Sequence, residues 1–413
     1  MARGLLRFFA GDEADGSLGP LLIVTLLSTT AFAALWSYAG IWCVKGLHAS
    51  PGTVGIVYAV DAVAAATAGY FGGRLSDRLG RRFMICLGWG GEAAAALALV
   101  AVGNRSYLGF ALIVVAGAAS GPGFAATNAI VADLVPENRR EAAYATLRVV
   151  SNIGYAAGPP LAALAIVGGH WARLFIGSGI VGMASAVVAG TFLKAPSAER
   201  PSDDDSKAGN RAGAILRDAP FLLLLLSTLL AFIVYVAYEN VLPIASVSYL
   251  HLPATTWGLL MIINPIVVAL SQIRVTRAVQ KVPPAQRLAG SLLLMGMPFL
   301  LLILSSSVAV IAVVICLFAV GEMVWVPTSQ ALAASLAPSR SRGAYMGAFG
   351  ASGSVAWAIG PLAALSLLGA HGPAATWIFF ACMGAVAGAA GGAASMLSTL
   401  RPRPVAKPAE LVR

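Results

Sequence analysis

Charged residues are scarce in this chain, and that scarcity is the first constraint on its class. Of 413 residues only 11% are Asp, Glu, Lys or Arg, while 59% are hydrophobic. A soluble globular domain carries about 25% charged residues. The composition therefore excludes an ordinary soluble globule and predicts a protein that is embedded in a lipid bilayer.

Histidine and cysteine are also rare, with four of each. The cysteines lie inside or at the edges of apolar runs without CxxC spacing, so neither a disulfide framework nor a zinc site is indicated. The sequence contains no HExxH, GxSxG or GxxxxGK(S/T) motif, which argues against an intramembrane enzyme and an ATP-driven pump. We expect a protein that is not an enzyme and that uses no cofactor and no metal.

Long apolar runs are abundant. A helix needs about 20 apolar residues to cross the hydrocarbon layer, and twelve stretches meet that need. They lie approximately at 19–45, 51–72, 82–103, 106–133, 142–167, 172–194, 218–247, 254–275, 285–306, 308–336, 343–369 and 374–398. The sequence therefore predicts an all-α membrane protein with twelve transmembrane helices.

The net charge of +10 reports topology rather than nucleic-acid binding, because the basic residues stand in short clusters between apolar runs. With loops assigned alternately to the two sides, Lys45, Arg105 and Arg173 fall on one side and Arg148 inside a helix. Every other Lys and Arg falls on the side of both termini. The positive-inside rule then places both termini in the cytoplasm. We expect a monomer in a bacterial cytoplasmic (inner) membrane, with lipid rather than nucleic acid around it.

Two halves are visible in the sequence. Residues 194–217 are polar and contain prolines and three consecutive aspartates, which predicts a cytoplasmic linker between a six-helix bundle at 1–193 and another at 218–413. The stretch TNAIVADLVP at 127–136 matches SQALAASLAP at 329–338, at an offset of about 202 residues. Six helices per repeat give both copies the same polarity, and substrate sites in such proteins lie near the midplane between the repeats.

The loop after the second stretch carries a family signature. Residues 73–82 read GRLSDRLGRR, which resembles the GxLaDrxGrr loop of major facilitator transporters. A basic loop would explain the arginines but not the glycines and the aspartate. The resemblance implies the major facilitator fold, with a latch that joins the cytoplasmic ends of the stretches at 51–72 and 343–369 in the outward-facing state. The latch residues it implies are Gly73, Asp77, Arg78, Gly80 and Arg81.

Two further motifs resemble the drug/proton antiporter subgroup of that family. Gly154, Gly158 and Pro159 resemble its GxxxGP helix, although a small-residue face also serves simple helix packing. Gly321 followed by Glu322 is similar to a Gly-Glu pattern in multidrug/proton antiporters. The resemblance implies proton-coupled efflux of small lipophilic or cationic compounds; the alternative is proton-coupled transport of a polar metabolite such as a sugar or an organic acid.

Ionisable residues inside the predicted helices are the candidates for coupling. They are Asp61, Glu92, Glu239 and Glu322, with Arg148 the one internal base. Each costs about 2.5–3.5 kcal/mol at a helix centre on insertion scales, so each must be paired, protonated or functional.

No histidine lies at membrane depth, so proton coupling would have to use these carboxyl groups. We expect Glu322 to carry the proton, with Asp61 and Glu239 next and Arg148 as the counter-charge. Glu92 fits a packing role better, because glycines surround it in sequence.

Overall fold

The computed structural model describes residues 18–103, 105–135, 140–193, 215–338 and 342–400, and within these ranges every regular element is a helix. Ten helices are long and apolar enough to cross a membrane. A further helix, α6 (Arg140–Ala165), has the length but carries more polar residues. The last helix, α16 (Arg342–Thr399), breaks at Gly372, where φ is 76°, into two crossings. Twelve crossings result, as the sequence predicts.

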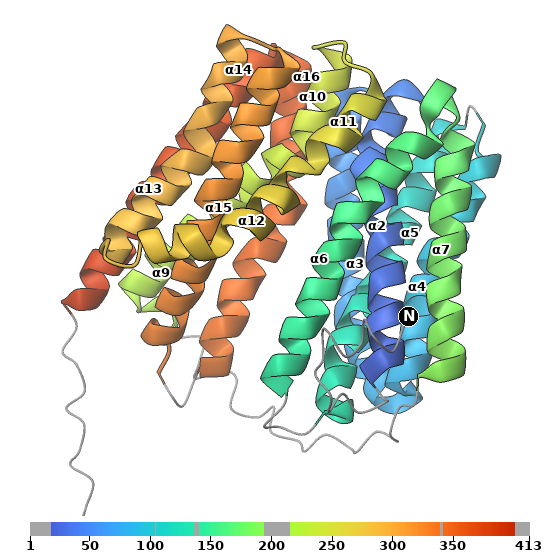
Figure 1. Ribbon diagram of the computed structural model, residues 1–413, viewed down its shortest axis with the longest axis horizontal. Coiled ribbons are helices and arrows are strands. Elements are labelled where there is room, and N and C mark those ends of the chain that lie inside the picture. The colour runs from blue at the N-terminus through green and yellow to red at the C-terminus, as the bar shows by residue number, and fades with distance from the viewer. Residues whose placement is uncertain (1–17, 104, 136–139, 194–214, 339–341, 401–413) are drawn as a thin grey trace, which may run out of the picture.

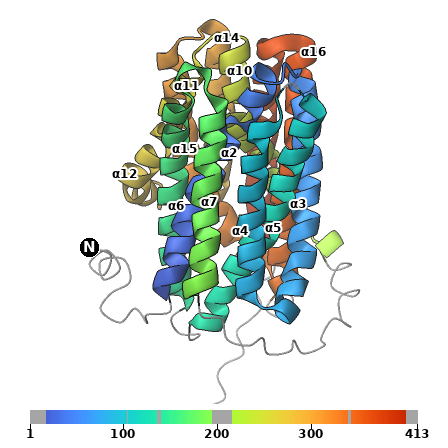
Figure 2. The same ribbon diagram turned by 90° about the vertical axis from the view of Figure 1, so that its right-hand side faces the viewer.

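The first six crossings are single helices packed into one bundle (Figures 1 and 2). They are α2 (Leu18–Lys45), α3 (Pro51–Leu79), α4 (Arg81–Ala98), α5 (Ser106–Leu134), α6 and α7 (Trp171–Phe192). Capping residues mark where some of them begin. Ser50, for example, accepts a hydrogen bond from the backbone N–H of Thr53 ahead of Pro51, the first residue of α3.

The second six crossings are more often interrupted. The helix α9 (Ala219–Val236) continues through the π-helical turn η5 (Ala237–Val241) into α10 (Leu242–Ser248). One crossing combines α11 (Ala254–Met261) with α12 (Ile263–Ala278), and another combines α13 (Pro284–Gly296) with α14 (Leu301–Leu304). The remaining crossings are α15 (Val308–Leu336) and the two parts of α16. The expected linker at 194–217 lies mostly outside the described residues.

Two equivalent contacts are among those that join the two bundles at one end of the molecule. A Cβ atom on Gly55 of α3 would lie 2.8 Å from the carbonyl oxygen of Pro361 in α16, and one on Gly258 of α11 would lie 2.9 Å from the carbonyl oxygen of Pro159 in α6. Only glycine permits such an approach. The two contacts exchange the roles of the repeats, as expected for halves that are related by a twofold axis.

The bundles are apart at the other end, which we call the terminal end because α2 begins there and α16 ends there (Figure 1). Gly73 at the end of α3, and Gly347 and Gly350 at the start of α16, have no neighbouring heavy atom within 4 Å of a Cβ position. The space between the bundles is therefore closed at one end and open at the terminal end.

Candidate transport site

A cavity of about 1290 Å³ lies between the two bundles. Its walls come from α2, α3, α5 and α6 on one side, and from α9, η5, α11, α12, α15 and α16 on the other. Pockets for single small molecules measure about 300–1,000 Å³, so this cavity has room for one such molecule together with water. Its position between the repeats is the position that the sequence predicts for a substrate site.

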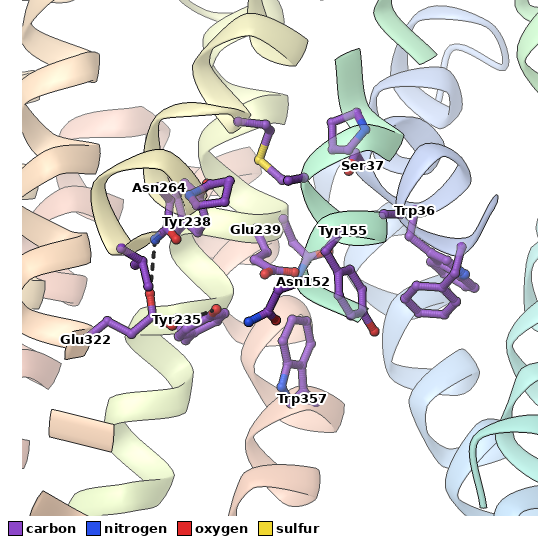
Figure 3. A pocket seen from close by; sticks show the side chains of 18 of the residues that line it. Trp36, Ser37, Asn152, Tyr155, Tyr235, Tyr238, Glu239, Asn264, Glu322 and Trp357 are labelled. Atoms are coloured by element: carbon purple, nitrogen blue, oxygen red, sulfur yellow. Dashed lines mark hydrogen bonds between the residues drawn. The ribbon is translucent and has the colours of Figure 1, made fainter. Parts of the chain in front are cut away.

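Glu322 lies in the wall formed by the second bundle and is held by two neutral donors (Figure 3). The Asn264 side-chain N–H donates to its Oε2 at 3.0 Å, and the Tyr235 hydroxyl donates to its Oε1 at 3.3 Å. These partners come from α12 and α9, so three separate helices position one carboxylate. Hydrogen bonds from such donors compensate a buried negative charge.

Glu239 lies on the π-helical turn η5 and also faces the cavity. A π turn inserts an extra residue into a helix and is common at functional sites. Figure 3 shows Glu239 pointing toward the α6 side chains Asn152 and Tyr155, and it lies close enough to Glu322 for the two charges to repel. Among the described residues, no side chain donates a hydrogen bond to Glu239.

Asp61 lies in the opposite wall, on α3, directly against Gly117 of α5. A Cβ atom on Gly117 would overlap the Asp61 carboxylate, so the glycine makes the space for it. The Asp61 Oδ1 atom is buried without a hydrogen-bond partner in the described part of the chain. A buried polar atom without a partner is uncommon and costs free energy.

Glu92 lies behind the same wall. It is only 5% exposed, and its Oε1 accepts a hydrogen bond of 3.3 Å from the indole N–H of Trp36. Trp36 itself lines the cavity, whereas Glu92 does not. The sequence-based preference for a packing role did not anticipate this contact, because the partners are 56 positions apart and no local pattern indicates the pair.

Arg148 is exposed on the cavity side of α6. It lies close enough to Glu322 for their charges to attract. Among the described residues, however, no carboxylate lies within 4.0 Å of its guanidinium. Arg148 therefore supplies a positive charge to the cavity without a direct ion pair in this conformation.

Aromatic side chains complete the cavity and make it partly apolar. Tyr235 packs against Phe318 and Trp357 at ring-centroid distances of 5.4 and 6.3 Å. On the opposite side Phe32 packs against Phe124 and Tyr155 at 5.2 and 6.2 Å. Aromatic faces attract cations and apolar groups alike, and both walls supply them.

The loop motif holds together the terminal end of the first bundle. Arg81 forms an ion pair of 3.1 Å with Asp133 at the end of α5, and its guanidinium also contacts the Ser76 hydroxyl. Gly80 separates α3 from α4 with a φ of 92°, a value that favours glycine. The side chain of Asp77 lies outside the described residues, and Gly73 and Arg78 lie on the last turns of α3. The latch to the second bundle, which the family resemblance implies, therefore stays a prediction.

The motif of Gly154, Gly158 and Pro159 lies on α6 and packs against α2. A Cβ atom on Gly158 would come within 2.7 Å of both the Ala33 Cβ and the Ala34 backbone nitrogen of α2, and one on Gly154 would lie 3.1 Å from the Leu26 carbonyl oxygen. Pro159 lines the cavity. Gly360 of the second repeat similarly approaches Val236. The glycine before the proline therefore makes a close helix contact in both halves.

These features agree with comparisons to known proteins. The Major Facilitator Superfamily profile matches residues 21–361. The chain belongs to this family.

Its relatives include a Na(+), Li(+), K(+)/H(+) antiporter of Planococcus maritimus, 24% identical over 362 residues, which cover 80% of this chain and 85% of the relative. Another is the multidrug resistance protein MdtH of Cronobacter sakazakii, 25% identical over 330 residues, which cover 79% of this chain and 80% of the relative.

Solved structures show the same fold. The nucleoside transporter NupG superimposes with a TM-score of 0.75 at 14% identity, over 91% of this chain and 98% of the other. A bacterial homologue of the human lysosomal transporter Spinster, in its inward-facing and unoccupied conformation, gives a TM-score of 0.73 at 14% identity, over 94% and 98%. The predicted fold and family are therefore confirmed, and the chain is an integral membrane protein of a transporter family.

Proposed function

We propose that this protein is a secondary transporter that exports small lipophilic or cationic compounds in exchange for protons, by alternating access. The observation that carries the proposal is the cavity between the repeats, whose walls hold Asp61, Glu239 and Glu322 but only one base, Arg148, among the described residues. Excess negative charge beside aromatic faces favours a cation with an apolar body. The same carboxyls can bind protons, because a charge at that depth is costly.

The proposed direction of transport rests on the shape together with the charge distribution. The cavity opens at the terminal end, and the positive-inside rule assigns that end to the cytoplasm. In this conformation the carboxyls accept a compound from the cytoplasmic side. Rocking of one bundle against the other, as in other transporters built from repeats, would release the compound outside.

One relative is named an antiporter of alkali cations and protons, which supports antiport, and the other is named a multidrug resistance protein, which supports an organic substrate. Aromatic packing around Glu322 favours the organic cation, because a small inorganic ion would gain more from additional oxygen ligands than from rings. A polar metabolite remains the alternative. Neutral donors and acceptors such as Asn152, Asn240 and Gln272 also line the cavity and could hold such a molecule.

The experiment is transport by purified protein in proteoliposomes with an imposed pH gradient. We expect a lipophilic cation such as tetraphenylphosphonium to move against its own gradient when protons flow the other way. The control is the triple variant Asp61→Asn, Glu239→Gln, Glu322→Gln in identical vesicles, which should show no pH-driven accumulation.

Separate assays with sodium, potassium and a neutral sugar complete the test. Movement of only an alkali cation or only the sugar would reject the organic-cation proposal. Ohmic current without coupled flux would identify a channel instead.

A further inference from the structure

The carboxyl groups of the two bundles differ in the hydrogen-bond donors and positive charges that lie near them. In the second bundle, Glu322 accepts hydrogen bonds from Tyr235 and Asn264 and lies near the positive charge of Arg148. In the first bundle, Asp61 has a buried oxygen without a donor in the described chain, and Glu92 has a single neutral donor. Donors and a nearby cation stabilise an ionised carboxylate, whereas burial without them favours the neutral acid.

The described surroundings of Asp61 contain no positive charge. The ionisable groups near it are Tyr58 on its own helix and Glu92 on α4, and Cys43 of α2 lies next to Tyr58. The helices α5 and α16, which pack against α3, place no further ionisable group of the described residues close enough to act on it. A proton is the simplest way to neutralise a carboxylate in such surroundings.

Glu92 interacts electrostatically with Asp61, and it is linked to the cavity by its hydrogen bond with Trp36. Its charge and that of Asp61 repel, so a proton on one eases ionisation of the other. The remaining ionisable group that faces Glu92 is the Tyr155 hydroxyl of α6, and no Lys or Arg of the described chain lies within 4.0 Å of it. The Trp36 indole N–H can support an ionised Glu92, and Trp36 forms the wall between Glu92 and the cavity.

We propose a division of labour: Asp61 and Glu92 of the first bundle bind the transported proton, Trp36 positions Glu92, and Glu322 remains an anion that holds the cationic substrate. This rests on the proposed function. When the cavity faces the cytoplasm, as it does here, Asp61 first holds its proton; entry of the cationic substrate into the cavity then displaces that proton into cavity water and leaves Asp61 as a carboxylate. When it faces outside, Asp61 takes a proton from external water and becomes neutral again, so one proton enters in each cycle.

The internal repeat supports this division. Asp61 and Asn264 occupy corresponding positions of α3 and α12, and Ser120 corresponds to Glu322. The second bundle thus places an amide where the first has the acid, and that amide donates to Glu322. The two repeats have exchanged acid and neutral partner, which gives the two walls of one cavity different chemistry.

The test compares Asp61→Asn and Glu92→Gln with Glu322→Gln in proteoliposomes. For each variant, pH-driven accumulation, exchange of substrate down its own gradient, and binding of tetraphenylphosphonium are measured. We expect Asp61→Asn to lose pH-driven accumulation while its binding stays within about twofold of wild type. Glu322→Gln should weaken binding by about tenfold or more, a loss of about 1.4 kcal/mol, and any remaining transport should stay coupled.

Two positioning variants extend the test if a carboxyl variant fails to fold. Gly117→Ala places a Cβ on the Asp61 carboxylate, and Trp36→Phe removes the donor to Glu92. Both should move the pH dependence of transport, while Gly177→Ala, a glycine with no neighbour within 4 Å, should not.

Loss of coupling in Glu322→Gln together with preserved coupling in Asp61→Asn and Glu92→Gln would overturn the division of labour. It would restore Glu322 as the proton carrier without affecting the proposed function. If the wild-type protein moves no substrate in response to a pH gradient, the proposed function itself fails.

Discussion

Single polar residues decide how this chain can exist in a bilayer. Each buried polar group needs a partner, because the hydrocarbon offers none. Asp218 shows how a buried polar group outside the cavity obtains its hydrogen-bond partners. It is buried, its carboxylate accepts from the backbone N–H of Phe221 at the start of α9, and the Tyr345 hydroxyl of α16 donates to it at 3.0 Å. One side chain therefore caps one helix and ties it to another.

At this scale we predict that Asp218→Ala destabilises the protein without abolishing transport. Loss of an N-cap costs about 0.5–2 kcal/mol, and the buried Tyr345 hydroxyl loses this acceptor as well. The measurement is thermal unfolding in detergent, together with pH-driven transport. Tyr345→Phe removes the tyrosine hydrogen bond but keeps the cap, so it should lower the unfolding temperature by less. An unchanged unfolding temperature in Asp218→Ala would contradict the prediction.

Several helix pairs in this fold approach each other closely through small residues. Without a hydrophobic force between helices in lipid, close backbone packing supplies much of their attraction. The pair Gly154 and Gly158, four residues apart, presents one face of α6 to α2. Prolines at 159 and 160 sit in the same helix, where they weaken the backbone hydrogen bonding locally.

We predict that Gly158→Ala lowers stability, because its new methyl group would overlap the backbone of α2 at Ala34. Overpacking of this kind costs about 1–3 kcal/mol. Gly177→Ala on α7 has open space around it and should be neutral or slightly stabilising, because alanine favours a helix by about 1 kcal/mol over glycine. Unfolding temperatures of the two variants in the same detergent test this contrast, and equal values would reject it.

The whole molecule is organised by two contacts that are related by the repeat. Gly55 lies against Pro361, and Gly258 lies against Pro159. Both join the bundles at the end opposite the termini, so they stabilise the conformation that is open at the terminal end. The loop motif around Asp77 would stabilise the alternative, if it latches the terminal ends as the family resemblance implies.

We therefore predict opposite effects for two substitutions. Gly258→Ala should weaken the contact with Pro159 and shift the population toward the state that is open away from the termini. Asp77→Asn should weaken the latch and shift it toward the state seen here. Labelling of single introduced cysteines at each end, in a background where the four native cysteines are replaced, measures the shift. Shifts in the same direction would contradict the prediction that the two substitutions act on opposite conformations.

The sequence by itself determined the class, the helices and the repeat. Apolar length sets the number of crossings, since a helix that is too short or too polar does not span the bilayer. The boundaries expected for the twelve stretches agree with the helices to within a few residues, except that α3 continues to Leu79, seven residues past the expected end. The structure agrees with the repeat, because Pro159 and Pro361 take equivalent positions at the contact between the bundles.

Only the tertiary structure decided which ionisable residues have partners. Glu322 and Tyr235 are 87 residues apart, and Trp36 and Glu92 are 56 apart, so no local spacing encodes either pair. The π turn that carries Glu239 and the contact between Gly117 and Asp61 likewise arise from the packing of helices. Hydropathy measures the cost of placing a charge in the membrane. What compensates that cost depends on which helices meet, and the sequence pattern alone does not contain that information.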